Sequence, residues 1–547
     1  MSQTKAQLLN PLSGVVSSGD IKANSITIGK GANSVNSNTV LGQTALDDAV
    51  TGVNNTAVGI NALSVNTSGQ ANTAIGAYTI DSNTTGSFNT GVGLQALTEL
   101  TTGSNNTAIG QYSGALMTTA GGNTSVGQAS LQSATTGYNN VAIGQYALRL
   151  NETGYQNVAV GYKALDANTS NNNVAVGKHA LLSNTTGGNN TAVGVNALDA
   201  NTTAGYNTAV GSNALGANTT GHTNTAVGNQ SLLSNVDGFR NTGLGSDSLR
   251  SNTTGIQNVA VGSFALDQNT TASHNTAIGH NTLNQNTTGA RNTAVGSEAL
   301  DANTTASDNT AIGYIALSAN TTGTANTALG SFCLDVNTTG NNNTGVGTGA
   351  LGANTEGLTN TAVGSQSLTA NTTGDNNTAL GGYTLDVNTT GSSNTAVGTG
   401  SLGSNTTASD NTAVGLSALT SNTTGSLNTA VGSLAMDAST TASNCTAVGY
   451  TALGSLTTGF RNIGVGQNAL GALTTGIYNV AVGTFANQNA TTASSNVAMG
   501  YHALNQTTTG GNLVGIGYEC LAANTTGGDN VAVGSIALDA NTTGSAN

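Results

Sequence analysis

The sequence contains very little charge, few aromatic residues, a single proline and no tryptophan. Of its 547 residues, 6% are charged and 3% are aromatic. Globular chains ordinarily carry about 25% charged residues, and a chain of this length divides into several domains, so a set of ordinary globular domains is not indicated. With 10 basic against 23 acidic residues the net charge is −13, which excludes the basic face that a nucleic-acid partner requires.

Long apolar segments are also missing. No run of about 20 apolar residues is present, and we therefore expect no membrane insertion. The opening MSQTKAQLLNPLSG lacks the apolar core of a secretion signal. These features predict a soluble chain that is made in a cytoplasm.

A 17-residue repeat fills most of the sequence. The unit that opens at Asn55 reads NTAVGINALSVNTSGQA, and the pattern N-T-A-V/I-G-x-x-A-L-x-x-N-T-T-G-x-x occurs 30 times from residue 38 onward. We number its positions 1 to 17 from that asparagine. One unit, 157–172, is a residue short in the segment that corresponds to N-T-T-G, where a turn tolerates deletion. The repeat predicts an attachment segment at residues 1–37 and a repeat shaft at residues 38–547.

This repeat predicts an all-β fold, a parallel β-solenoid (β-roll) of about 30 coils in which each coil is one 17-residue unit. Such a unit is too short for a pair of helices, and the glycine and N-T-T-G segments would interrupt helices. The T-A-V-G segment alternates as a short strand, and A-L is expected to form a second strand. The expected core consists of positions 3, 4, 8 and 9, which in the first full unit are Ala57, Val58, Ala62 and Leu63.

Glycine is invariant at one repeat position and replaceable at another. Position 5 is glycine in every unit, as at Gly59 and Gly76. This predicts either a positive φ angle or a close approach of another backbone segment. Position 15 is alanine in seven units, so the turn there does not require a positive φ angle.

Two further columns indicate stacking in register. Position 12 is asparagine in 21 of 30 units, for example Asn66 and Asn83, which predicts amide ladders along the stack. Apart from Ala49, the exceptions form two blocks, which limits the bonds lost at block boundaries. They are Leu100, Met117 and Ala134, and then Ser439, Leu456, Leu473, Ala490 and Thr507.

Position 10 carries 12 of the 33 charged residues. It is aspartate in ten units and never in two adjacent coils, where like charges would repel each other. Its two arginines, Arg149 and Arg250, are each followed one coil later by an aspartate, Asp166 and Asp267. We predict that each arginine lies beside its aspartate on one outer face.

The sequence predicts no catalytic residue, no cofactor and no metal site. Cys333 and Cys520 replace the small residue at position 8 and Cys445 replaces asparagine at position 1. We interpret them as small buried thiols, with metal or disulfide roles as the alternative. The five histidines are spread along the variable positions and form no catalytic constellation. We therefore predict a protein that is not an enzyme.

Aromatic residues occupy the variable positions. All 13 tyrosines and 6 phenylalanines fall at positions 6, 7, 16 or 17, which we expect to be exposed corners. One concentration contains Tyr112, Tyr138, Tyr146, Tyr155 and Tyr162. Exposed aromatics are enriched in recognition surfaces, although corner residues that vary freely are the alternative. The candidate contact surface is the second concentration, which contains Tyr450, Phe460, Tyr478, Phe485, Tyr501 and Tyr518.

The V-A-V-G-x-x-A portion of the repeat resembles the head repeat of YadA-like trimeric adhesins, and the resemblance covers residues 38–547. It implies a parallel β-roll assembled as a homotrimeric rod. The 17-residue form is also similar to repeats of phage tail fibres, and MSQTKAQLL resembles the opening of such fibre proteins. Unlike bacterial adhesins of this family, the sequence shows neither a secretion signal nor a C-terminal barrel anchor, and it shows no tip domain of the kind that phage fibres often carry.

These resemblances imply a structural fibre protein of a phage tail or other virion appendage, assembled in the host cytoplasm. Residues 1–37 would bind a virion or tail protein, and the shaft would act as a spacer and contact a host surface receptor. A bacterial surface adhesin or extracellular filament subunit is the alternative. An ice-binding protein is a weaker alternative, because the adjacent threonines at positions 13 and 14 should point to different sides.

Overall fold

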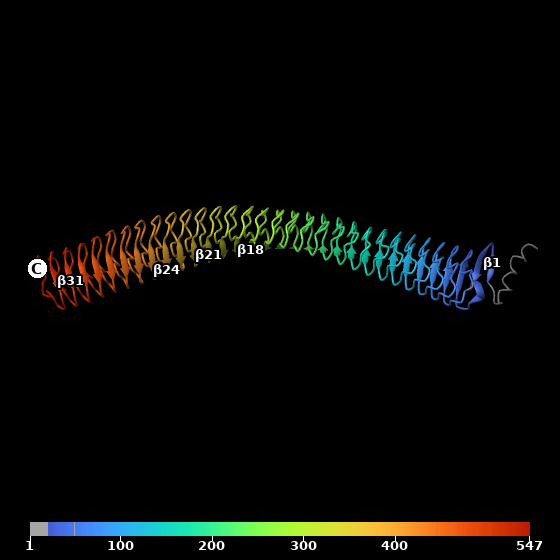
Figure 1. The fold of residues 1–547 in the computed structure, drawn as a ribbon, viewed down its shortest axis with the longest axis horizontal. Helices are drawn as coiled ribbons and strands as arrows, with labels where there is room; N and C mark the ends of the chain where they lie inside the picture. The colour runs from blue at the N-terminus through green and yellow to red at the C-terminus, as the bar shows by residue number, and fades with distance from the viewer. Residues whose placement is uncertain (1–19, 49) are drawn as a thin grey trace, which may run out of the picture. The chain divides into compact units, whose positions relative to one another are not determined.

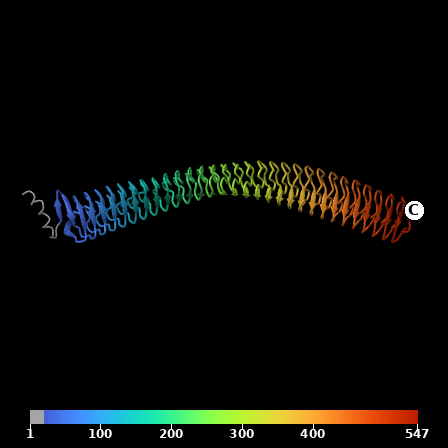
Figure 2. The same ribbon diagram turned by 180° about the vertical axis from the view of Figure 1, so that it is seen from behind.

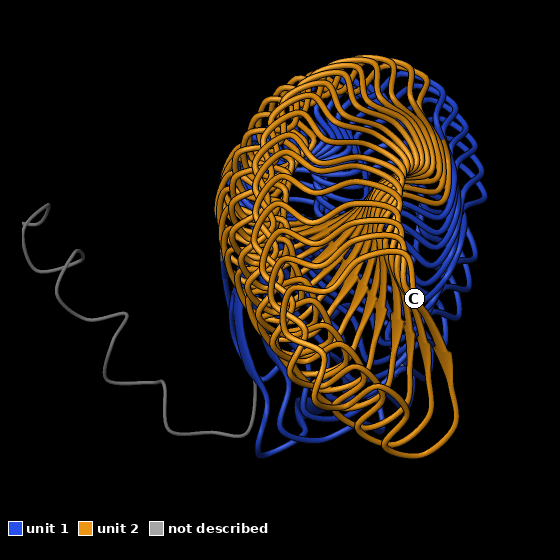
Figure 3. Ribbon diagram, turned by 90° about the vertical axis from the view of Figure 1, so that its left-hand side faces the viewer, with its two compact units in different colours: residues 1–272 blue, residues 273–547 orange. Residues whose placement is uncertain are grey.

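The computed structural model describes residues 20–48 and 50–547, which contain one short strand per repeat (Figure 1). The chain divides into two compact units, residues 1–272 and 273–547, and each is described by itself (Figure 3). Within each unit the repeat strands pair in parallel, and every pair is in register; Thr191, for example, pairs with Thr208 and Ala192 with Ala209. The predicted fold class, an all-β parallel β-solenoid with one 17-residue repeat per coil, is confirmed.

In the first unit the strands run along one side of the coils (Figure 2). They are β1 (Ile21–Ala23), β2 (Ile26–Gly29), β3 (Thr39–Gly42), β4 (Thr56–Val58), β5 (Thr73–Ile75), β6 (Thr90–Val92), β7 (Thr107–Ile109), β8 (Thr124–Val126), β9 (Val141–Ile143), β10 (Val158–Val160), β11 (Val174–Val176), β12 (Thr191–Val193), β13 (Thr208–Val210), β14 (Thr225–Val227), β15 (Thr242–Leu244) and β16 (Val259–Val261). A 3-10 turn, η1, spans Ala32–Ser34.

The second unit is built in the same way. Its strands are β17 (Thr276–Ile278), β18 (Thr293–Val295), β19 (Thr310–Ile312), β20 (Thr327–Leu329), β21 (Thr344–Val346), β22 (Thr361–Val363), β23 (Thr378–Leu380), β24 (Thr395–Val397), β25 (Thr412–Val414), β26 (Thr429–Val431), β27 (Thr446–Val448), β28 (Ile463–Val465), β29 (Val480–Val482), β30 (Val497–Met499), β31 (Val514–Ile516) and β32 (Val531–Val533).

A hairpin covers the first coil. Strands β1 and β2 are antiparallel, and β2 pairs antiparallel with β3 of the first repeat. The Asp20 carboxylate accepts hydrogen bonds from the N–H groups of Lys30 and Gly31 at 2.5 and 2.7 Å. Residues 20–37, which belong to the predicted attachment segment 1–37, thus close a sheet edge that would otherwise be open. Residues 1–19 lie outside the described residues, and so does the docking role predicted for them.

The expected second strand at A-L is absent from the described coils. Positions 7 and 9 both have left-handed backbone conformations; φ is +56° at Asn61 and +52° at Leu63. Side chains of consecutive residues in a strand point to opposite faces, yet Ala62 and Leu63 are both fully buried. The left-handed residue turns the leucine inward beside its neighbour, and the prediction of a strand there is wrong.

The predicted core is wrong at position 4. Ala57 at position 3 is fully buried, whereas Val58 at position 4 is half-buried and Ile75 is 41% exposed. Alternation along the strand explains this, because only one of two neighbouring residues can face the interior. Within the coil the buried positions are 1, 3, 8, 9, 12 and 15, so asparagine takes the place expected for larger apolar side chains.

Two asparagine columns run through the interior of each unit. At position 12, Asn83 Nδ2 donates to Asn66 Oδ1 in the preceding coil at 2.9 Å and to the carbonyl of Gly86 in its own coil at 3.0 Å. This is the predicted ladder. The ladder at position 1 was not predicted. There Asn72 donates its backbone N–H to Asn55 Oδ1 at 3.0 Å and its Nδ2 to the carbonyl of Gly86 at 2.9 Å.

The predicted loss of hydrogen bonds at block boundaries is confirmed. Asn83 and Asn422 are the last asparagines before the two blocks of other residues at position 12. The Oδ1 atom of each is buried without a hydrogen-bond partner. Within the block the hydroxyl of Ser439 is also unpartnered. A buried unpaired polar group costs about 1–3 kcal/mol, so each block boundary destabilises the stack.

The glycine at position 5 is required for two reasons. Gly59 has φ of +134°, a conformation that L side chains rarely adopt. A Cβ atom on Gly59 would also lie 2.3 Å from the carbonyl oxygen of Gly76 in the next coil. Both predicted explanations, positive φ and close backbone approach, therefore apply at this glycine. Glycines at position 15, such as Gly69, lack the positive φ angle, as predicted.

We expect Gly211→Ala to destabilise the first unit by more than about 2 kcal/mol, because φ is +139° and the new Cβ atom would lie 2.3 Å from the Gly228 oxygen. Urea unfolding and limited proteolysis would show a lower midpoint and new cleavage near residues 207–223. The matched control is Gly221→Ala at position 15 of the same coil. Its Cβ atom would also lie 2.3 Å from a carbonyl oxygen, that of Gly238, but its φ angle is not positive and alanine occurs at this position in seven other units. Equal effects of the two substitutions would contradict the assigned role of position 5.

Candidate functional site

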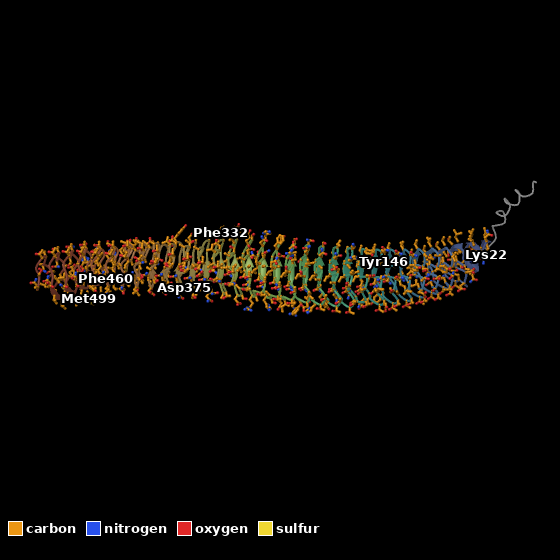
Figure 4. The ribbon with its side chains drawn as sticks, turned by 90° about the horizontal axis from the view of Figure 1, so that it is seen from above. Lys22, Tyr146, Phe332, Asp375, Phe460 and Met499 are labelled. Atoms are coloured by element: carbon orange, nitrogen blue, oxygen red, sulfur yellow. The ribbon has the colours of Figure 1, made fainter. Side chains whose placement is uncertain are left out.

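The surface of each unit consists of columns of equivalent residues, and Figure 4 shows the side chains projecting from the coils along their length. The column at position 10 contains the two predicted arginine–aspartate pairs. Arg149 donates from Nε and Nη2 to the two carboxylate oxygens of Asp166 at 2.9 and 3.1 Å. The guanidinium of Arg149 also lies 5.3 Å from the ring centre of Tyr146, in the cation–π range.

The second pair is also confirmed. Arg250 Nη2 donates to Asp267 Oδ2 at 3.1 Å. Its Nε atom lies 2.8 Å from Asp267 Oδ1, within ion-pair distance. Both predicted pairs therefore stack one coil apart, as the 17-residue register requires. Because the arginines are about one third exposed, such pairs are worth under about 1 kcal/mol.

A third pair of this kind was not predicted. Arg291 donates from Nε and Nη2 to the carboxylate of Asp308 at 2.6 and 2.9 Å. Both residues occupy position 17 in consecutive coils, so opposite charges one repeat apart were a visible signal in the sequence. The guanidinium holds the pKa of Asp308 below its ordinary value.

Most of the aspartates at position 10 form no ion pair with an arginine or lysine among the described residues, although His179 and His280 act on Asp199 and Asp301. Six of them are half-buried, and desolvation by burial raises the pKa of each above its ordinary value; they are Asp81, Asp199, Asp301, Asp335, Asp386 and Asp437. Desolvation of a carboxylate favours its neutral form. The column at position 10 therefore contains carboxylates that lack the compensation Asp166 receives from Arg149.

The outer face of the parallel sheet is partly apolar. Positions 2 and 4 point outward. Position 2 is threonine on most repeat strands and valine or isoleucine on the others, and position 4 is valine, isoleucine, leucine or methionine. The larger residues at position 4 are the most exposed, for example Leu380 at 47%, Leu244 at 45% and Met499 at 41%. Contiguous exposed apolar columns are unusual on a monomeric protein and are typical of an interaction surface.

The six predicted contact residues are brought together only in part. Phe460 and Tyr478 lie edge to face with ring centres 5.4 Å apart, and Arg461 Nη1 donates to the Tyr478 hydroxyl at 3.0 Å. A second group forms at positions 6 and 7, where Tyr501 stacks on Tyr518 at 5.6 Å and lies 6.3 Å from Phe485.

Tyr450 is 52% exposed and belongs to neither group. The two groups lie at repeat positions on either side of the strand, so the six aromatics do not form one continuous patch. The sequence register already assigned them to two pairs of positions, and this was the signal that they would separate.

The earlier concentration of tyrosines is likewise divided. Tyr138 and Tyr155 at position 16 stack with ring centres 4.9 Å apart and an interplanar angle of 3°. Tyr146 and Tyr162 form an edge-to-face pair at 6.2 Å. Rings one coil apart therefore contact each other where the columns place them together, which shields part of each ring and leaves its outer edge for a partner.

The three cysteines are buried free thiols, which confirms the interpretation as small buried residues. Burial raises the pKa of the Cys333 thiol to about 12, so the thiolate does not form near neutral pH. Cys445 takes the place of an asparagine in the position 1 ladder. Its N–H donates to Asn428 Oδ1 at 3.0 Å, and its sulfur accepts the N–H of Asn462 at 3.5 Å.

Among residues 20–48 and 50–547, no three His, Cys, Asp or Glu side chains are grouped closely enough to hold a metal ion. No helix in that part of the chain is long and apolar enough to cross a membrane. A search of protein-family models gives no match to this sequence, and a search of curated proteins gives no significant match.

The unpaired aspartates predict a pH dependence of stability. Their folded-state pKa values are raised, so between the unfolded value near 3.8 and the raised value the folded chain binds more protons. The stability they contribute is present below the unfolded pKa and is lost as the pH rises through the folded pKa. We expect Asp199→Asn/Asp301→Asn/Asp437→Asn to unfold at a higher temperature than the unsubstituted chain at pH 7, with the difference vanishing toward pH 3.5.

The matched control is Asp308→Asn, for which the sign is opposite because Arg291 lowers the pKa of Asp308. This substitution should destabilise at pH 7, and its effect should fade as the pH falls through the folded pKa. Thermal unfolding followed by circular dichroism measures both differences. A pH-independent difference for the triple variant would show that burial does not shift these carboxylates.

Proposed function

We propose that this chain is a structural fibre protein of a phage tail or another virion appendage, in which it serves as a rigid shaft and contacts the host surface. The observation that carries the proposal is that each described coil uses its interior for stacking. Asparagine, small residues and leucine fill the coil, and every strand repeats the one before it in register. Such an interior suits a spacer. The similarity of the repeat to phage fibre and trimeric adhesin repeats supports the same function.

The shaft is a homotrimer in this proposal. A single chain leaves its outer sheet face uncovered, with residues such as Leu329, Leu380 and Ile278 about two fifths exposed or more. Burial of apolar surface contributes about 25 cal/mol per Å², and a column with one such residue per coil sums over many coils. Identical chains present identical columns, so parallel association covers all of these columns together.

We expect the purified chain to have three times the 53.4 kDa mass of one copy when it is measured by light scattering. Leu380→Lys together with Leu329→Lys should shift the mass toward one copy, because buried charges at position 4 oppose association. Thr373→Lys at the exposed position 14 is the control and should leave the trimer intact. A stable monomer of the unsubstituted chain would contradict the homotrimer.

Particle labelling tests the fibre proposal itself. Antibodies raised against residues 38–547 should label an appendage on particles from the native source in electron micrographs, because the proposal places the chain in the virion. Labelling of a bacterial cell surface, with particles unlabelled, would instead support the alternative of an adhesin or extracellular filament subunit. Antibodies depleted with the purified chain provide the control.

The same particles test host contact by the aromatic groups. Tyr478→Ser/Phe485→Ser/Tyr501→Ser removes a ring from each group while the ladders in the interior stay unchanged. If these groups bind a receptor, adsorption of particles to host cells should fall about tenfold or more. Unchanged adsorption on an intact, labelled appendage would confine the role of the chain to the shaft.

A further inference from the structure

A hollow of about 510 Å³ opens on the surface of the second unit, where three successive coils meet. Its lining comes from repeat positions 6, 7, 10 and 11 of these coils. The hollow exists because the middle coil has glycine at positions 7 and 10, Gly349 and Gly352, where the coils before and after it carry larger residues. Its volume lies within the range of about 300–1,000 Å³ that is typical of small-ligand sites.

An aromatic ring forms one wall of this hollow. Phe332 is 43% exposed and meets Tyr314 of the preceding coil edge to face, with ring centres 5.5 Å apart and an interplanar angle of 89°. This contact holds the orientation of the Phe332 ring. The residue that follows at position 7 is Gly349, which has no side chain to cover the ring. Figure 4 shows Phe332 projecting from the coils, so the ring offers an apolar surface to a ligand.

Three polar side chains lie around the same space. The Gln366 amide extends over Gly349 from the next coil, since its Nε2 atom lies 2.5 Å from the place that a Cβ atom of Gly349 would occupy. Asp335 and Thr369, from the coils on either side, each turn a side-chain oxygen toward Gly352. An amide, a hydroxyl and a carboxylate together supply both hydrogen-bond donors and acceptors. The hollow therefore combines one apolar wall with a polar rim.

The polar rim is not used by the fold itself. In the part of the chain that the structure describes, the side chains of Gln366 and Thr369 form no hydrogen bond within the protein. The Asp335 carboxylate accepts hydrogen bonds from the backbone of Asp335 and Val336, and it forms no ion pair with a described residue. All three polar side chains are half-buried. Their hydrogen-bonding capacity is therefore available to a ligand.

Charge and polarity around the hollow limit the class of ligand. Between Arg291 and Arg461 the sequence contains nine aspartates or glutamates and no lysine or arginine. A phosphate, sulfate or carboxylate would find no cation there and would be repelled by Asp335. A purely apolar ligand would remove the carboxylate and the Gln366 amide from water without pairing them, which is unfavourable. The hollow therefore suits an uncharged ligand that has both an apolar face and several hydroxyl groups.

We propose that the hollow at Gly349 and Gly352 binds a neutral hexose unit of an oligosaccharide. One face of a hexopyranose ring presents C–H groups, which pack against the negative face of an aromatic ring such as Phe332. The hydroxyls of the sugar both donate and accept hydrogen bonds, so they match the carboxylate, the amide and the hydroxyl of the rim. One chain forms the whole site, and the inference stands whether or not the protein is a virion fibre.

Calorimetric titration and saturation-transfer NMR with the full chain test the ligand class. The probes are tetramers of glucose, mannose, galactose and N-acetylglucosamine. At least one tetramer should bind with a Kd of about 1 mM or tighter. Cyclohexanol, which has a six-membered ring but a single hydroxyl, should bind at least about tenfold more weakly than that tetramer. Failure of all four tetramers to bind, or equal affinity for cyclohexanol, would overturn the proposal.

A charged counterpart tests the requirement for a neutral sugar. Replacing each hexose of the bound tetramer by its uronic acid keeps the ring and adds carboxylates, which Asp335 repels. This acidic tetramer should bind at least about tenfold more weakly at low salt, and the difference should shrink as added salt screens the repulsion. Equal or tighter binding of the acidic tetramer would contradict the assignment of a neutral ligand.

Matched variants locate the binding. Phe332→Ala should weaken the bound tetramer at least about tenfold, whereas Phe264→Ala, at the same repeat position in the first unit, should change its affinity less than about twofold. Gly352→Leu fills the hollow with a residue that occurs at position 10 in other coils, at Leu182 and Leu233. It should abolish binding while the thermal unfolding midpoint stays unchanged. Equal weakening by the two phenylalanine variants, or full binding by Gly352→Leu, would contradict the site.

Discussion

The structure depends on hydrogen bonds between equivalent groups of successive coils. A single coil is too small to enclose an apolar core of its own, and its interior positions are occupied largely by asparagine, alanine and leucine. Buried asparagine is unfavourable unless both its oxygen and its nitrogen are paired. Asn72 meets this condition only because its Oδ1 atom accepts the N–H of Asn89 in the next coil and its Nδ2 atom donates to the carbonyl of Gly86. The register is therefore a condition of stability at every coil.

This requirement explains why so much of the fold could be predicted and where prediction ended. Residue types that are fixed at one repeat position indicate that the coils stack in register. From this stacking, the sequence alone predicts the Arg149–Asp166 pair and the ladder at Asn66 and Asn83. The path of the chain inside one coil was harder to predict. Leu63 is buried beside Ala62 because of a left-handed backbone, a conformation that leucine gives no reason to expect. The outward turn of Val58 follows from that path.

The candidate surfaces were predicted in the same uneven way. Composition identified the aromatic corners, and their division into two groups followed from the repeat positions.

The carboxamide columns also have a direction. Where two asparagines follow each other at position 12, the Nδ2 atom donates to the preceding coil, as Asn83 does to Asn66 and Asn320 to Asn303. Within each unit, one cut end would therefore present oxygen acceptors and the other N–H donors. During synthesis, a finished coil offers free acceptors to the coil that emerges next, so the older part acts as a template for the newer. Folding that follows the ribosome from the capped β1–β2 end needs no search among registers.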